Sequence, residues 1–259
     1  MSANTAGRPQ ARLAIVGVVL LALLIACFFA GEFLKTLTDQ RYVDTRAFFG
    51  VPNFLNVVSN LAFLAVGAAG LALCAGPRRP PALASWRVFY LGMVLTCLGS
   101  TWFHLAPSDA TLVWDRLGMV IAFVGLAFAV LEEGAGLHAR PALLAGAVLA
   151  SATSVWWWRR SGDMRLYSWV QLAPLACAGV SLALRWLPAA MARALAASFV
   201  CYAAAKLAEL YDAGIYAATG HLVSGHTLKH LMAAAGAAAI LIVQWRRAGP
   251  GAPPDRPFT

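Results

Sequence analysis

Charged residues are scarce in this sequence. Asp, Glu, Lys and Arg make up only 12% of the 259 residues, about half of the share that is usual in a soluble domain. Hydrophobic residues account for 61%, and the mean hydropathy is +0.70. This composition excludes a water-soluble globular enzyme and an intrinsically disordered protein, because it offers too little polar surface for either. It predicts an integral membrane protein.

Cysteine is also sparse, and its placement excludes a disulfide-stapled secreted domain. All the cysteines lie within apolar stretches, where a thiol packs as a small hydrophobic side chain; they are Cys27, Cys74, Cys97, Cys177 and Cys201. The net charge of +9 comes without a basic stripe or a base-stacking motif, so we expect no nucleic-acid partner.

Long apolar runs predict eight membrane-spanning helices, each of about 20 residues. They cover Leu13–Ala30, Phe54–Leu73, Val88–Leu105, Leu112–Leu131, Pro141–Trp158, Leu166–Leu184, Ala194–Asp212 and Gly225–Trp245. We therefore expect an all-α polytopic transmembrane helical bundle in one domain, residues 12–247. The polar N-terminus, residues 1–11, and the Pro-rich tail, residues 248–259, are expected to be disordered.

The distribution of Lys and Arg between the predicted loops indicates the orientation. With the N-terminus inside, the cytoplasmic segments hold eleven of these residues and the outer segments hold six. This asymmetry favours an N-in, C-in topology, which an even number of spans allows. The Ala-, Arg- and Gly-rich composition suggests a bacterial inner membrane.

Polar residues gather at the outer ends of three predicted spans. Ser100 and His104 lie one turn apart, Asp115 opens the next span, and His226 and His230 share one face of the last span. Three neutral imidazoles and an open position form the ligand set of a catalytic zinc ion. Taken separately, the last two histidines would suit an interfacial pair, and His104 would suit a hydrogen-bonding residue at a helix end.

A second polar group interrupts the seventh span. Lys206, Glu209 and Asp212 are spaced three residues apart, which predicts a ladder of ion pairs inside the bundle. Alternatively, Asp212 lies close enough to the outer end to support the metal site. Lys229 stands between two of the histidines, but helical spacing places it on another face, so we assign it no catalytic role.

The order Ser-x3-His, then Asp eleven residues on, then a distant His-x3-His, resembles the alkaline ceramidase family. This family belongs to a superfamily of seven-span membrane hydrolases that includes adiponectin-receptor-like proteins. The resemblance runs from about Asp39 to Trp245 and rests on NFLNVVSNLAFL, GSTWFHLAPSDATLVWDRLGM and SGHTLKHL. The seven family spans match from Phe54 onward, so the first span would be an additional helix.

The resemblance implies that His104, His226 and His230 bind zinc, with Asp115 as general base and Ser100 supporting the oxyanion. It implies a hydrolase that cleaves the amide of a ceramide-like lipid to a fatty acid and a sphingoid-type amine. Zinc lowers the pKa of bound water to about 7, which suits this reaction. The expected partner is a membrane lipid substrate, and no obligate protein partner is evident.

Two further sets of residues are implied near this site. Animal alkaline ceramidases hold calcium in the loop before the second span, and Asp39, Asp44 and Asn53 stand at part of that position. Here Asn53 replaces an acid and two arginines add positive charge, so a solvated loop capped by Asp44 is the alternative. Ser59 and Asn60 resemble a Ser-Asn pair of the family and are expected to form hydrogen bonds between helices.

Other functions compatible with the sequence are not enzymatic. Two of the histidines suit the axial ligands of haem, and a zinc-bearing receptor-like protein would use the same three. A transporter would use the charged group of the seventh span, but no inverted repeat supports it.

Overall fold

The structure is a computed structural model that describes residues 7–31, 33, 42–77 and 79–248. It is a bundle of helices, and 81% of the residues that the structure describes are helical. In chain order these are α1 (Gly7–Phe29), α3 (Phe54–Ser59), α4 (Leu61–Ala75), α5 (Leu83–Leu105), α6 (Asp109–Ala135), α7 (Pro141–Ser161), α8 (Arg165–Ala183), α9 (Ala189–Leu210), α10 (Asp212–Ala218) and α11 (Gly225–Ala248).

Eight helical segments of the described chain are long and apolar enough to cross a membrane, α3 and α4 together forming one of them. The predicted all-α bundle and the eight spans are therefore confirmed, and the protein is a multi-pass membrane protein. The helical domain begins at Gly7 rather than at residue 12. Arg12, near the start of α1, contacts the rest of the bundle: its guanidinium donates to the Gly134 carbonyl at 2.9 Å and stacks on the Trp186 ring. Residues 1–6 and 249–259 lie outside the described residues.

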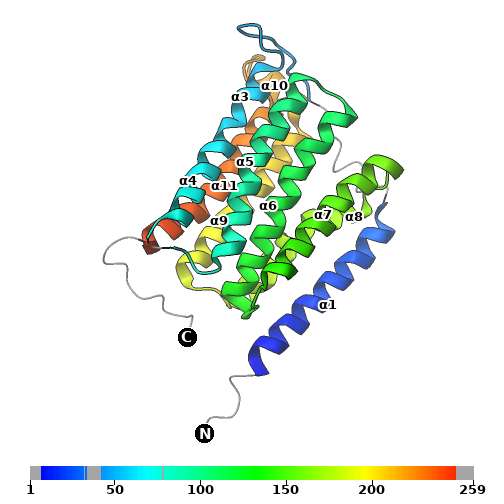
Figure 1. Ribbon diagram of the computed structural model, residues 1–259. Coiled ribbons are helices and arrows are strands. Elements are labelled where there is room, and N and C mark those ends of the chain that lie inside the picture. The colour runs from blue at the N-terminus through cyan, green and yellow to red at the C-terminus, as the bar shows by residue number, and fades with distance from the viewer. Residues whose placement is uncertain (1–6, 32, 34–41, 78, 249–259) are drawn as a thin grey trace.

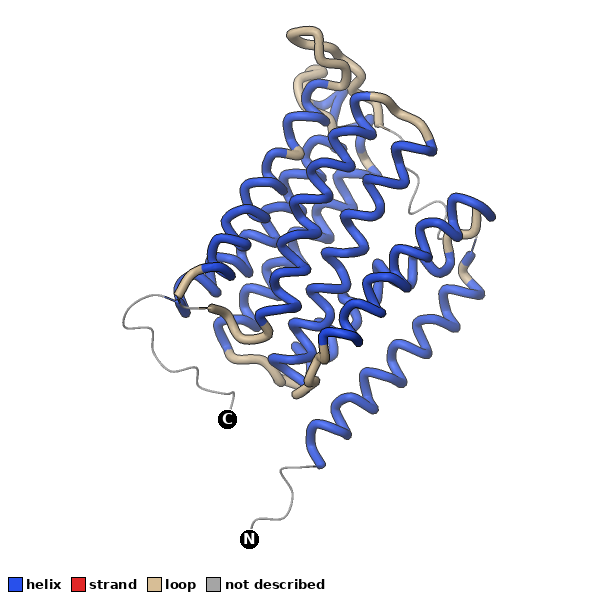
Figure 2. The backbone as a smooth tube through the Cα atoms, viewed as in Figure 1, coloured by secondary structure: helices blue, strands red, loops and turns tan. Residues whose placement is uncertain are grey.

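The helices form two unequal groups (Figures 1 and 2). α5 and α6 run through the middle, with α3, α4, α9 and α11 on one side and α7 and α8 on the other. α1 lies at the edge against α8, where the Trp169 indole donates to the Leu20 carbonyl at 2.9 Å. The start of α1 and the end of α11 lie at the same end of the bundle (Figure 1).

Four glycines bring α5 and α6 into backbone contact. They are spaced seven residues apart on each helix, at Gly92 and Gly99 and at Gly118 and Gly125. A Cβ atom on Gly99 would lie 2.2 Å from the Trp114 carbonyl oxygen, and one on Gly118 would lie 2.3 Å from the Thr96 nitrogen. Small residues allow this approach of helices in membranes. It places the C-terminal end of α5 directly beside the start of α6.

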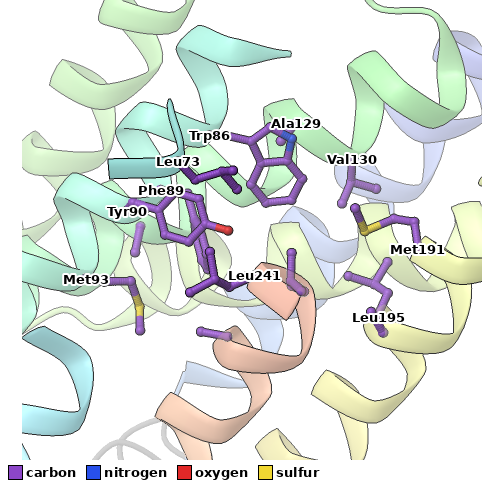
Figure 3. Packing of buried hydrophobic residues seen from close by; sticks show 14 of the residues in the cluster. Leu73, Trp86, Phe89, Tyr90, Met93, Ala129, Val130, Met191, Leu195 and Leu241 are labelled. Carbon is purple, nitrogen blue, oxygen red and sulfur yellow. The ribbon is translucent and has the colours of Figure 1, made fainter. Parts of the chain in front are cut away.

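The apolar core is centred on the half of the bundle that contains the start of α5, away from the contact between the end of α5 and the start of α6 (Figure 3). Trp86, Phe89 and Tyr90 form a group of aromatic rings on α5, 5.0 to 6.2 Å between centroids. The Tyr90 hydroxyl donates to the Gln244 amide oxygen at 2.7 Å, which gives this buried oxygen of α11 a hydrogen-bond partner. The buried polar residues at the C-terminal end of α5 form a separate cluster.

Candidate metal centre

Three buried histidines meet at the end of the bundle opposite this core. His104 lies in the last turn of α5, and His226 and His230 lie in the first turns of α11. One nitrogen from each ring can be chosen so that all three atoms lie within 4.8 Å of one another. The Nε2 atoms of His104 and His226 are 3.3 Å apart. The sequence predicted this convergence, and the packing of α5 against α11 through α4 produces it.

The geometry of the three rings fits a metal ion. Two ligands of a tetrahedral ion with bonds of about 2.0–2.1 Å lie about 3.3–3.4 Å apart, which matches the His104–His226 separation. Ser59 Oγ lies 2.8 Å from His230 Nδ1 and so leaves the Nε2 atom of that ring for coordination. The Nδ1 atoms of His104 and His226 are buried without a hydrogen-bond partner among the described residues. The cluster could thus hold a metal through Nε2 atoms.

The same separation argues against haem. Two axial ligands must stand on opposite faces of the macrocycle. No ring fits between nitrogen atoms 3.3 Å apart, and His226 and His230 project from adjacent turns of one helix.

Asp212 fixes the start of α11. One of its carboxylate oxygens accepts the His226 backbone N–H at 2.7 Å, and the other accepts the Val43 N–H at 2.8 Å. A carboxylate is favourable there because the first N–H groups of a helix lack partners within the helix. Gly225 allows the approach, since a Cβ would lie 2.0 Å from the Ala208 carbonyl oxygen. Asp212 therefore positions His226, a member of the candidate metal centre, through its backbone.

The predicted ion-pair ladder forms only in part. Lys206 pairs with Glu209, but Asp212 does not continue the series, because α9 ends at Leu210 and Asp212 opens α10. Lys229 instead completes the network, with its ammonium 2.9 Å from the other Glu209 oxygen.

Asn56 joins three elements around the metal centre and was missed in the sequence. Its amide oxygen accepts from the Thr227 hydroxyl at 2.9 Å, and its amide nitrogen donates to the Asp44 carbonyl at 3.1 Å. Both Ser59 and Asn60 were expected to form hydrogen bonds between helices. Ser59 does so with His230 of α11, but the Asn60 amide donates to the Asn56 carbonyl of the preceding turn at 2.9 Å. The signal was the spacing of asparagines at 53, 56 and 60 in an otherwise apolar span.

Residues 42–53 lie against the three histidines at this end of the bundle. The Tyr42 ring lies 4.9 Å from the His104 ring and 5.2 Å from the His226 ring, between centroids. Arg46 holds both oxygens of Asp44 at 2.8 Å and donates to the Leu222 carbonyl at 2.8 Å. The Arg46 guanidinium lowers the pKa of the Asp44 carboxyl. The segment is thus tied to the end of the bundle.

The residues considered for calcium have other partners. Both Asp44 oxygens accept from Arg46, and the Asn53 amide donates to the His104 carbonyl at 2.7 Å. Asp39 lies outside the described residues. The Arg46 guanidinium therefore neutralises Asp44 at the position where the resemblance implies calcium. The calcium site stays a prediction.

Ser100 and Asp115 lie beside the histidines and face one cavity. Both are buried. With His230 they line a cavity of about 190 Å³, whose remaining walls are mostly apolar side chains of α4, α5, α6, α8, α9 and α11. Lys229 lines the same cavity, so the expectation that it faces elsewhere is corrected.

Comparison with protein-family models and with curated proteins finds no match. The resemblance to alkaline ceramidases stays a prediction from the motifs, and the candidate chemistry depends on the geometry alone.

Proposed function

We propose that the protein is a zinc-dependent membrane amide hydrolase acting on a ceramide-like N-acyl lipid. One observation carries the proposal: a buried three-histidine cluster reaches, through His230 and beside a carboxylate and a hydroxyl, a mostly apolar cavity inside the bundle. A metal-assisted hydrolase needs ligands with an open position, a proton acceptor and a site for the substrate. The cavity suits a hydrocarbon chain.

Zinc bound by the three imidazoles would supply a water of low pKa and a Lewis acid for an amide carbonyl. Asp115 then has two tasks: its carboxylate accepts a proton from the attacking water and delivers it to the leaving amine. The Ser100 hydroxyl donates to the carbonyl oxygen as negative charge develops there. The apolar cavity walls hold the chain and exclude water from the reacting amide.

The test separates metal binding from chemistry. Asp115→Asn keeps the shape of the side chain but removes the proton acceptor, so hydrolysis per bound zinc should fall by about 10²–10⁴-fold. Ser100→Ala should cost about 10–10³-fold, as loss of one oxyanion donor can. Purified protein is incubated with a panel of N-acyl lipids, and released fatty acid is measured by mass spectrometry.

Two outcomes would contradict the assignment. If Asp115→Asn loses zinc, Asp115 is a ligand or a support of one rather than the proton acceptor. If the wild-type protein holds zinc but hydrolyses no amide, a zinc-bearing receptor-like function replaces the hydrolase.

We place this site near the outer face of a bacterial inner membrane, with both termini in the cytoplasm, on the asymmetry of Lys and Arg. A reporter fused after Arg247 should be cytoplasmic, and one within residues 214–224 should be external. The reverse pattern would overturn the orientation.

A further inference from the structure

The three histidines of the metal centre differ in what lies against them. Of the three, only His230 lines the cavity. His104 and His226 are buried, and the Tyr42 ring packs against both, with 4.9 and 5.2 Å between ring centres. Tyr42 itself lies outside the cavity. The metal centre therefore has two sides: the cavity reaches one, and Tyr42 lies against the other.

A metal ion must reach this centre from water, because an unpaired charge is costly in hydrocarbon and in an apolar cavity. The cavity walls are mostly apolar, which suits a lipid chain better than an ion. The end of the bundle is more polar. His104 lies in the last turn of α5 and His226 in the first turn of α11, and the Asp212 carboxylate accepts from the His226 N–H at the same end. An ion is therefore better accommodated on the side that Tyr42 covers.

Two hydrogen bonds hold the residues around Tyr42 against the start of α11. The Val43 N–H donates to the Asp212 carboxylate at 2.8 Å, and the Arg46 guanidinium donates to the Leu222 carbonyl at 2.8 Å. Both acceptors belong to α10 or to the loop that joins it to α11. Tyr42 is only half-buried. Local opening of a segment held by so few contacts requires no helix to unfold.

We propose that Tyr42 is the gate through which a metal ion enters and leaves the three-histidine centre, while the cavity beside His230 serves the organic substrate. The gate opens when the two hydrogen bonds to α10 and its loop break. The residues after Tyr42 stay anchored, because the Asn56 amide holds the Asp44 carbonyl at 3.1 Å. This inference rests on the proposed metal binding and is independent of the reaction that the metal supports.

Co²⁺ is the probe, because a tetrahedral Co²⁺ site absorbs visible light, so loading and release can be followed directly. The full chain in nanodiscs is stripped of metal, and the rate constants of Co²⁺ association and of release to excess chelator are measured. Tyr42→Ala should raise both rate constants about 5- to 100-fold, the factor expected from the loss of two aromatic contacts. The dissociation constant should change by less than about 3-fold, because a change that favours the open gate equally with and without metal shifts no binding equilibrium.

Two control variants separate the gate from other roles. Tyr42→Phe keeps the ring and should exchange metal at the wild-type rates. Phe199→Ala removes a matched aromatic ring from the cavity wall and should also leave both rate constants unchanged. If Phe199→Ala speeds exchange as much as Tyr42→Ala does, the ion has a route through the cavity and the gate is overturned.

The ratio of the two rate constants decides between a gate and a support. If Tyr42→Ala raises only the release rate, and so weakens affinity, the ring supports the imidazoles and gates nothing. Arg46→Gln provides the test if Tyr42→Ala fails to fold, since it keeps the ring and loses the contact with Leu222. It should speed exchange in both directions by about 10-fold, and unchanged rates would overturn the gate.

Failure of the gate and failure of the proposed function are distinguishable. If the wild-type chain binds neither Co²⁺ nor Zn²⁺, the gate and the metal-dependent function fall together. If metal exchange behaves as expected and no N-acyl lipid is cleaved, the gate stands and only the hydrolase falls.

Discussion

Replacing Gly99 by Ala tests whether the contact between α5 and α6 positions the proposed reactive groups. The new Cβ would lie 2.2 Å from the Trp114 carbonyl oxygen, 2.5 Å from its carbon and 2.8 Å from the Asp115 nitrogen. These are backbone atoms of a helix, which cannot rotate away as a side chain can. An ordinary contact begins near 3.4 Å, so α5 and α6 must separate locally by about 1.2 Å.

This displacement predicts two measurable losses. Overpacking of a tight contact costs about 1–3 kcal/mol of stability, which lowers the thermal unfolding midpoint in detergent. A shift of about 1 Å between reacting groups costs about 10²-fold in rate, here between Asp115 and the residues of α5. Zinc content per chain, unfolding temperature and hydrolysis of the preferred N-acyl lipid are measured on the same samples.

Gly146→Ala is the matched control. Gly146 also lies within a long helix, α7, but its added Cβ would meet no atom within 4 Å. Alanine there should be neutral or stabilise the helix by about 0.5–1 kcal/mol, because glycine loses more conformational freedom on folding. If Gly99→Ala behaves like this control in both stability and activity, the two helices are not held in backbone contact and the reasoning is refuted.

Three further predictions follow from the metal centre and its cover. Metal analysis should find one zinc per chain, which His230→Ala loses and His138→Ala keeps; full occupancy in the first variant would exclude His230 as a ligand. Ser59→Ala should weaken zinc affinity about 10–100-fold, the usual cost of losing a partner of a ligand, as measured by competition with a chelator. Arg46 depresses the pKa of Asp44, so their pairing should stabilise the covering loop above about pH 4 and fade as pH falls further. Amide exchange in residues 42–53 should show this acid loss, and Arg46→Gln should abolish it.

Much of the fold could be predicted because the bilayer demands apolar helices of nearly fixed length. The eight runs were visible for this reason, and their ends differ from the observed helices by a few residues. The metal centre was visible because spacing places His226 and His230 on one helical face, and the topology brings His104 to the same side of the membrane. The break at Asn60 and the short α10 were not visible. The Asn60 amide donates to the Asn56 carbonyl of the preceding turn, and Asp212 at the start of α10 accepts from the backbone of His226 at the start of α11. Neither contact leaves a periodic pattern in the sequence.

The position of Lys229 shows where single-helix reasoning fails. Consecutive residues on a helix point about 100° apart, which correctly separates Lys229 from His230 on the surface of α11. The cavity, however, is lined by residues of six helices, and both side chains face it. Glu209 then draws the Lys229 ammonium inward, since a carboxylate buried in α9 needs a partner. The role of a polar residue in such a bundle follows from the charge that the neighbouring helix presents, and the pattern along its own helix does not contain that information.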